Sequence, residues 1–141
     1  MNIEKHNERI EKHYEHEVDK TDQHAVRREE HIEKRLEREE SRFEGRAERA
    51  VEHAEKVVER GAAHVEKLEE KGRSPERIAK AEARAEKKAE RAAEHAIKVV
   101  EREEEKAERA EDKAVSETAE TALRAADRVV NLEEKEAEKL E

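Results

Sequence analysis

Apolar residues recur at spacings of three and four along the whole chain, and the pattern repeats every eleven residues. Counted in blocks from Glu4, the seventh position carries Ile10, Thr21, Ile32, Phe43, Ala54 and Val65. The second position is cationic or histidine (Lys5, His16, Arg27, Arg38, Arg49, Arg60, Lys71), and the eighth is acidic (Glu11, Asp22, Glu33, Glu44, Glu55, Glu66). Eleven residues make close to three helical turns, so each position keeps its direction along a helix. The pattern therefore predicts long helices that are nearly straight or slightly right-twisted.

The strongest helix-breaking signal lies at the midpoint of the chain, in Gly72-Arg73-Ser74-Pro75-Glu76. Gly72 is typical of a helix C-cap, Ser74 of an N-cap and Pro75 of a first helical position. We predict an all-α fold with a first helix over residues 1–71, a turn at 72–75 and a second helix over 76–141. The two helices would form an antiparallel hairpin or coiled coil, which could assemble into a larger bundle.

Weaker signals for a helix start lie near residues 21 and 41, at Thr21-Asp22 and at Ser41-Arg42-Phe43-Glu44, which has capping-box spacing. The apolar stripe runs through both places, so we expect the first helix to continue there. Gly45 and Gly61 do not shift the repeat, and we interpret them as small residues inside the helix.

Composition limits how much of a core the chain can form. Of its 141 residues, 52% are charged and 33% are apolar, and nearly half of the apolar residues are alanine. The length suits one domain, but so little apolar side-chain volume cannot form the core of a compact globule. Alanine, glutamate, lysine and arginine are among the strongest helix formers. We therefore expect a helical chain of modest tertiary stability. No cysteine is present, which excludes disulfides and thiolate chemistry.

Charge is sorted into stripes. The formal net charge is −9 and the only aromatic residues are Tyr14 and Phe43, which argues against nucleic-acid binding. On each predicted helix an acidic stripe follows one side of the apolar stripe, and a basic stripe follows the other. Parallel helices would set an acidic flank beside a basic one, whereas antiparallel helices set like flanks together. The turn favours the antiparallel arrangement, because exposed ion pairs contribute only a few tenths of a kcal/mol. We expect the unmatched stripes to favour lateral association between chains.

Membrane association finds little support in the sequence. No apolar run is longer than two residues, which excludes a transmembrane helix. The N-terminal residues lack the apolar core of a signal peptide, so a cytoplasmic location is the default expectation. Binding to a membrane surface would be weak, because the apolar stripe is mostly alanine and its flanks are not both basic.

The eight histidines are the only side chains that suggest a ligand site. His13 and His16 are three residues apart, and His53 and His95 occupy matching places in the two halves, so a transition metal or a haem could be bound. Other repeats carry arginine or lysine in the column of several histidines, and we favour the interpretation that the histidines are boundary polar residues. No residue lies in a catalytic motif or a Gly-rich phosphate loop. We expect no enzymatic activity, no cofactor and no metal.

The two halves of the chain contain near copies of one segment. Residues 47–60 (AERAVEHAEKVVER) and 89–102 (AERAAEHAIKVVER) agree at twelve of fourteen positions and differ only at Val51/Ala93 and Glu55/Ile97. Duplication and design would both produce such halves, and the chain resembles designed helical rods and bundles.

Alanine-rich blocks of the second half, at residues 92–96 and 125–129, resemble the eleven-residue repeats of group 3 late embryogenesis abundant proteins over about residues 81–141. The chain departs from the family where the family favours lysine (Glu86, Ile97, Val99, Ala110) and where it favours an acidic residue or glutamine (Arg91, Arg102, Lys113). The resemblance implies a stress protectant that is disordered when hydrated and helical when dried.

These observations favour a non-enzymatic structural or scaffold protein that self-assembles through its Ala/Val stripe. A stress protectant, and a helical bundle that binds a metal or haem through histidines, are the alternatives. Strong helicity in dilute buffer would favour the first, and coil that becomes helical on drying would favour the second. Metal or haem titration of His53→Ala and His95→Ala variants would test the third.

Overall fold

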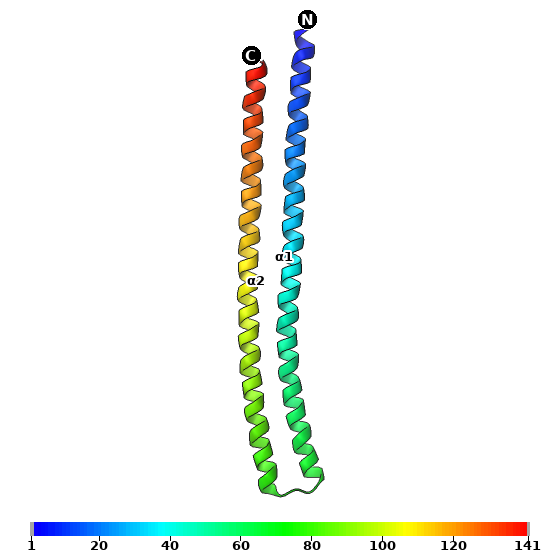
Figure 1. The fold of residues 1–141 in the computed structure, drawn as a ribbon, viewed down its shortest axis with the longest axis vertical. Coiled ribbons are helices and arrows are strands. Elements are labelled where there is room, and N and C mark those ends of the chain that lie inside the picture. Colours follow the sequence, from blue (N-terminus) through cyan, green and yellow to red (C-terminus); the bar gives the residue numbers. More distant parts are fainter. Residues whose placement is uncertain (1, 141) are drawn as a thin grey trace. The chain divides into compact units, whose positions relative to one another are not determined.

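The computed structural model describes residues 2–140, which form two helices, α1 (Ile3–Glu70) and α2 (Pro75–Leu140), and no strand (Figure 1). The predicted all-α fold of two long helices, packed as an antiparallel hairpin, is confirmed. The predicted helix limits at residues 1 and 141 lie outside the described residues. The helix bounds at the turn lie one residue from those expected, because Lys71 already leaves α1 and Pro75 belongs to α2.

Local capping explains where the helices begin and end. The Asn2 side chain accepts a hydrogen bond from the Glu4 N–H at 3.1 Å and caps the start of α1. Gly72 has φ 65° and donates its N–H to the Glu69 carbonyl, and the next residue donates to the Leu68 carbonyl, which is a Schellman motif. Ser74 then caps α2 by accepting from the Arg77 N–H at 3.3 Å. Each turn residue therefore does what the sequence predicts.

The chain divides into two compact units, and each combines a segment of α1 with the antiparallel segment of α2. The turn unit is Glu39–Arg109, and the terminal unit comprises residues 2–38 and 110–140. α1 is continuous through residues 21 and 41, where we had noted weak signals for a helix start. The Thr21 hydroxyl donates to the Glu17 carbonyl one turn earlier at 2.9 Å, as a hydroxyl inside a helix does, so it does not cap a new helix.

A narrow apolar seam holds each unit together. In the turn unit the half-buried or buried seam residues include Ala47, Ala50, Ala54, Val57, Gly61, Val65 and Leu68 of α1, and Ile78, Ala81, Ala85, Ala89, Ala92, Ala96 and Val100 of α2. In the terminal unit they include Ile10, Tyr14, Val18, Thr21, Ala25, Ile32 and Leu36, and Ala114, Thr118, Thr121, Ala125, Val129 and Leu132. The spacings of three, four and four residues are those of the repeat. Among residues 2–140, only Ile32, Ala96, Ala114 and Glu103 are buried.

Small side chains allow the helices of the turn unit to approach closely. A Cβ atom added to Gly61 would lie 3.0 Å from the Cβ of Ala85, which is closer than such atoms normally come. Gly45 is also inside α1, but a Cβ atom there would meet only the Arg49 guanidinium, at 3.7 Å. The interpretation of both glycines as interior helix residues is confirmed, and only Gly61 marks a close helix contact.

Candidate interaction surfaces

In the turn unit a groove runs along one side of the seam, with cationic side chains of α1 on one bank, or wall, and of α2 on the other. Its volume is about 590 Å³, and we call it the basic groove. The cations and the histidine that line it are Arg60, His64, Arg77, Lys80, Arg84 and Lys88, and the apolar lining is Val57, Gly61, Leu68, Ala81 and Ala85. No carboxylate lines the groove, and none of the five Arg and Lys side chains forms an ion pair with any residue between 2 and 140. The basic groove therefore presents positive charge that the chain itself does not neutralise.

A second groove in the same unit is apolar, with a volume of about 460 Å³. It is lined by Val51, Ala54, Glu55, Val58, Glu59, Ala89, Ala93, Ala96 and Ile97. Val58 and Arg60 are two residues apart on α1, so their side chains point to opposite sides of the seam. The apolar groove and its two carboxylates, which together we call the acidic edge, thus lie on the other side of the turn unit from the basic groove.

Large apolar side chains in the acidic edge are open to solvent. Ile97 is 57% exposed, Val58 is 51% exposed and Val51 is 42% exposed. Aliphatic side chains on opposite banks of one groove form a continuous apolar surface, unlike a single exposed valine, which needs no explanation. The seam does not cover this surface, so it remains accessible to another molecule.

The duplicated segments face each other across the seam of the turn unit. Gly61 lies against Ala85, and Arg46 lies 3.9 Å from Glu103, so residues 47–60 run antiparallel to residues 89–102 at the same level. Near-identical segments packed in this way are related by a local two-fold axis. The seam residues and the histidine are identical in the two copies. The residues that differ, Val51/Ala93 and Glu55/Ile97, all line the apolar groove. The two copies are therefore different only in the acidic edge.

The corresponding basic side of the terminal unit is partly neutralised by the chain itself. A groove there is lined by Lys20, His24, Arg28, Arg124 and Arg128, together with Glu17 and small or hydroxyl-bearing residues. Glu17 lies 3.8 Å from Lys20 and 3.9 Å from Arg128. This carboxylate bridges α1 and α2 and offsets part of the positive charge. The lining of the terminal groove is consequently less positive than that of the basic groove in the turn unit.

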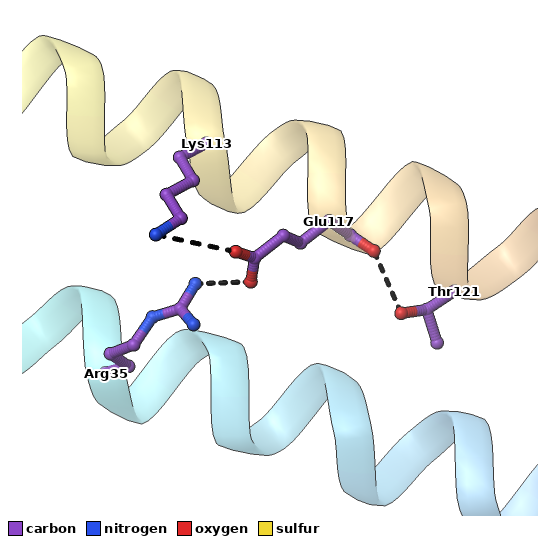
Figure 2. Close-up of polar contacts among 4 residues, drawn as sticks. All are labelled: Arg35, Lys113, Glu117 and Thr121. Atoms are coloured by element: carbon purple, nitrogen blue, oxygen red, sulfur yellow. Dashed lines mark hydrogen bonds and ion pairs between the residues drawn. The ribbon is translucent and has the colours of Figure 1, made fainter.

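In the terminal unit Glu117 forms an ion pair across the seam, and further polar contacts surround it (Figure 2). Its carboxylate accepts a hydrogen bond from Arg35 across the seam and lies 4.0 Å from Lys113, while Thr121 donates to its backbone carbonyl at 2.8 Å. The hydrogen bond from Arg35 lowers the pKa of the Glu117 carboxyl, as do the charges of Arg35, Lys113 and Arg28, and partial burial opposes them. Glu117 therefore stays ionised and joins the two helices on their basic side.

Glu103 is the one buried charged residue of the described chain, at 5% exposure. It occupies a seam position eleven residues after Ala92 and eleven before Ala114. Its carboxylate lies 3.9 Å from Arg46 and 3.4 Å from Lys106, and its Oε2 has no hydrogen-bond partner. Among so many carboxylates in the sequence, Glu103 was not predicted to be buried. The signal was available, because only an apolar or small residue is expected at that step of the repeat.

The four histidines considered as metal or haem ligands are all exposed. His13 and His16 lie on α1 in the terminal unit, and His53 and His95 lie at about the same level of α1 and α2 in the turn unit. Within residues 2–140, no group of three or more histidines, cysteines or acidic residues is placed so that it could hold a metal ion. The structure thus brings His53 and His95 to one level but supplies no third ligand there.

Neither α1 nor α2, over the described residues, has a segment that is both long enough and apolar enough to cross a bilayer. The chain matches no protein-family model, and no curated protein or solved structure matches it significantly.

Proposed function

We propose that this protein is a non-enzymatic structural protein whose helical hairpins associate with further copies of the chain. The Ala/Val stripe, which the sequence suggested as the assembly surface, is largely used within each unit, where α1 and α2 cover one another. The apolar residues that the seam leaves uncovered would then make the contact between chains. The main candidates are Val51, Val58 and Ile97 in the acidic edge.

One observation carries this proposal: the two near copies differ only at residues of the apolar groove. The two helices pack against each other in the seam in the same way in both copies, so the seam residues are identical. The differences fall at exposed positions beside the seam, and one of them replaces the carboxylate of Glu55 by the aliphatic side chain of Ile97. An exposed isoleucine contributes little to the stability of the hairpin itself. It contributes more if a second molecule covers it.

Val58→Ser tests the proposal, with Val26→Ser as its matched control. The two valines are almost equally exposed, at 51% and 53%, and both lie on α1. Val26 differs because the residues three and four positions away, Asp22, Gln23, Glu29 and Glu30, are all polar. Sedimentation equilibrium over a range of concentrations should show association of the wild type. Val58→Ser should weaken this association by about tenfold, because serine buries less apolar area in the contact than valine would.

The control variant should associate like the wild type, since Val26 has only polar residues one turn away on α1 and lines none of the grooves described. A wild type that stays monomeric up to millimolar concentration would refute the proposal. Equal effects of the two serine substitutions would show that the apolar groove has no special role. Circular dichroism of the same samples in dilute buffer would separate this proposal from a protectant that is unfolded in solution.

A further inference from the structure

We infer that the basic groove of the turn unit is a docking site for the acidic edge of a second copy of this chain. The inference rests on the proposed function, because it specifies how the copies meet. It requires a heterologous contact, in which two different surfaces of the molecule face each other. In an open assembly such a contact leaves one free groove and one free edge at the two ends, so further copies can add, whereas a closed ring has no free surface of either kind.

The chemistry of the basic groove calls for an anionic partner. Arg60 stands on the α1 bank, and Arg84 and Lys88 stand on the α2 bank, with the close contact between Gly61 and Ala85 at the floor. Because the floor residues are so small, the two banks lie close together and their like charges repel. Without a carboxylate in the lining, only a molecule from outside can relieve this repulsion.

The acidic edge of another copy fits this groove by charge and by repeat. Glu55 and Glu59 flank its aliphatic residues, and neither forms an ion pair within residues 2–140. Cations on α1 recur every eleven residues at Arg49 and Arg60, and carboxylates recur every eleven at Glu44, Glu55 and Glu66. At 1.5 Å per residue, both rows have a period of about 16.5 Å. When one cation of the groove row pairs with one carboxylate of the edge row, the next repeats of the two chains are therefore aligned as well.

A nucleic acid would share only part of this complementarity. Its phosphates carry the right charge, but they follow each strand every 3.4 Å or so and bring no match to the eleven-residue period. The net charge of −9 also opposes approach of a polyanion to the chain as a whole. A second copy supplies carboxylates, a matching period and aliphatic side chains that can cover the stems of the groove cations.

A symmetric contact between two acidic edges is the main competing geometry. It would bury Val58 and Ile97 against their counterparts, but it would also set the Glu55 and Glu59 carboxylates of the two copies against each other. Added salt would strengthen such a contact by screening the repulsion. In the heterologous contact opposite charges meet, so added salt weakens it. The sign of the salt dependence distinguishes the two geometries.

Charge reversal of each surface separately provides the decisive experiment. The groove variant is Arg84→Glu with Lys88→Glu, and the edge variant is Glu55→Lys with Glu59→Lys. The control for the groove variant is Lys12→Glu with Lys34→Glu, which changes the net charge equally but lies outside the grooves described and outside the cation row of Arg49 and Arg60. Glutamate, lysine and arginine have similar helix propensities, and circular dichroism would verify that all three variants keep the helicity of the wild type.

We expect sedimentation equilibrium to show that self-association of the groove variant and of the edge variant is each weakened by roughly tenfold or more. The control variant should associate like the wild type. An equimolar mixture of the groove and edge variants should recover association, because each reversed surface then finds its complement on the other protein. Raising the NaCl concentration from about 0.05 to 0.5 M should weaken wild-type association.

Several results would overturn the inference. A groove variant that associates as tightly as the wild type would leave the proposed function standing and remove the groove from it. Association that strengthens with salt, or variants that do not complement on mixing, would favour edge-to-edge contact. A groove that binds a short DNA duplex while the wild type shows no association would identify a different partner. A wild type that is monomeric throughout contradicts the proposed function itself.

Discussion

Ile32→Ala is the substitution that most directly tests whether the seam holds the terminal unit together. Ile32 is 2% exposed and is the only large side chain that is fully buried among the described residues. Replacing it with alanine removes three buried carbon groups from the contact with α2. At about 0.8 kcal/mol per buried methylene, the loss is about 2.4 kcal/mol of unfolding free energy. We expect little additional cost from a cavity, because small neighbours in a two-helix seam can close around the gap.

Leu123→Ala is the matched control, in the same unit and with the same number of carbon groups removed. Leu123 is 66% exposed, so about a third of the apolar contact is at stake and the expected loss is about 0.8 kcal/mol. Alanine is a better helix former than either residue, and this offsets a few tenths of a kcal/mol in both variants. The difference between the two variants, about 1.6 kcal/mol, is therefore more reliable than either value alone.

Urea unfolding followed by circular dichroism would measure both losses, and amide hydrogen exchange of the terminal unit would report them locally. The measurements belong at low protein concentration and at a second, higher one, because self-association would protect an exposed leucine. Equal losses in the two variants at low concentration would refute the reasoning. They would mean that burial between α1 and α2 does not determine the stability of this unit.

Two further predictions concern the close helix contact and the single tyrosine. Gly45→Ala should raise the free energy of unfolding of the turn unit, measured in urea, by about 0.5–1 kcal/mol. Gly61→Ala should raise it less or lower it, because the new Cβ atom would meet Ala85 at 3.0 Å. Equal gains in the two variants would show that the helices do not approach closely. Partial burial and the hydrogen-bonded carboxylate of Glu133 raise the pKa of Tyr14, so its stabilising contribution is complete below about pH 10 and is lost as pH rises through the folded pKa. Ultraviolet titration of this only tyrosine should show a raised midpoint that Glu133→Gln lowers, and an unchanged midpoint would contradict the contact.

The features that the sequence predicted well are those that depend on neighbouring residues. The turn follows from Gly72, Ser74 and Pro75, because a positive φ, a capping hydroxyl and a fixed φ each act within one helical turn. Both helices follow from composition and from the eleven-residue repeat. Most seam residues were also predictable, since the repeat keeps them on one face, but Val51 and Val58 of the same apolar stripe lie outside the seam, at 42% and 51% exposure.

The features that the sequence predicted poorly depend on the pairing of distant residues. The sequence predicted that antiparallel helices set like charges together. It did not predict a groove whose lining has no carboxylate, because that lining depends on the level at which Arg60 of α1 lies opposite Arg84 of α2. The position of Glu103 in the seam could be predicted from the repeat, but its partner could not, because Arg46 lies on the other helix, 3.9 Å from the Glu103 carboxylate. Hydropathy alone assigns such a glutamate to solvent, whereas the repeat assigns it to the seam.

The positions of the larger side chains support the proposal that the hairpins associate with one another. Within the seam of the turn unit, alanine and glycine dominate, and each buries little area. Val58 and Ile97 could bury much more, yet they lie outside the seam and are more than half exposed. A chain whose only requirement was a stable hairpin would gain by placing such residues between α1 and α2. Their position beside the seam is understandable if close approach of the two helices serves to form a charged groove on one side and an aliphatic groove on the other, and if a second chain completes the burial.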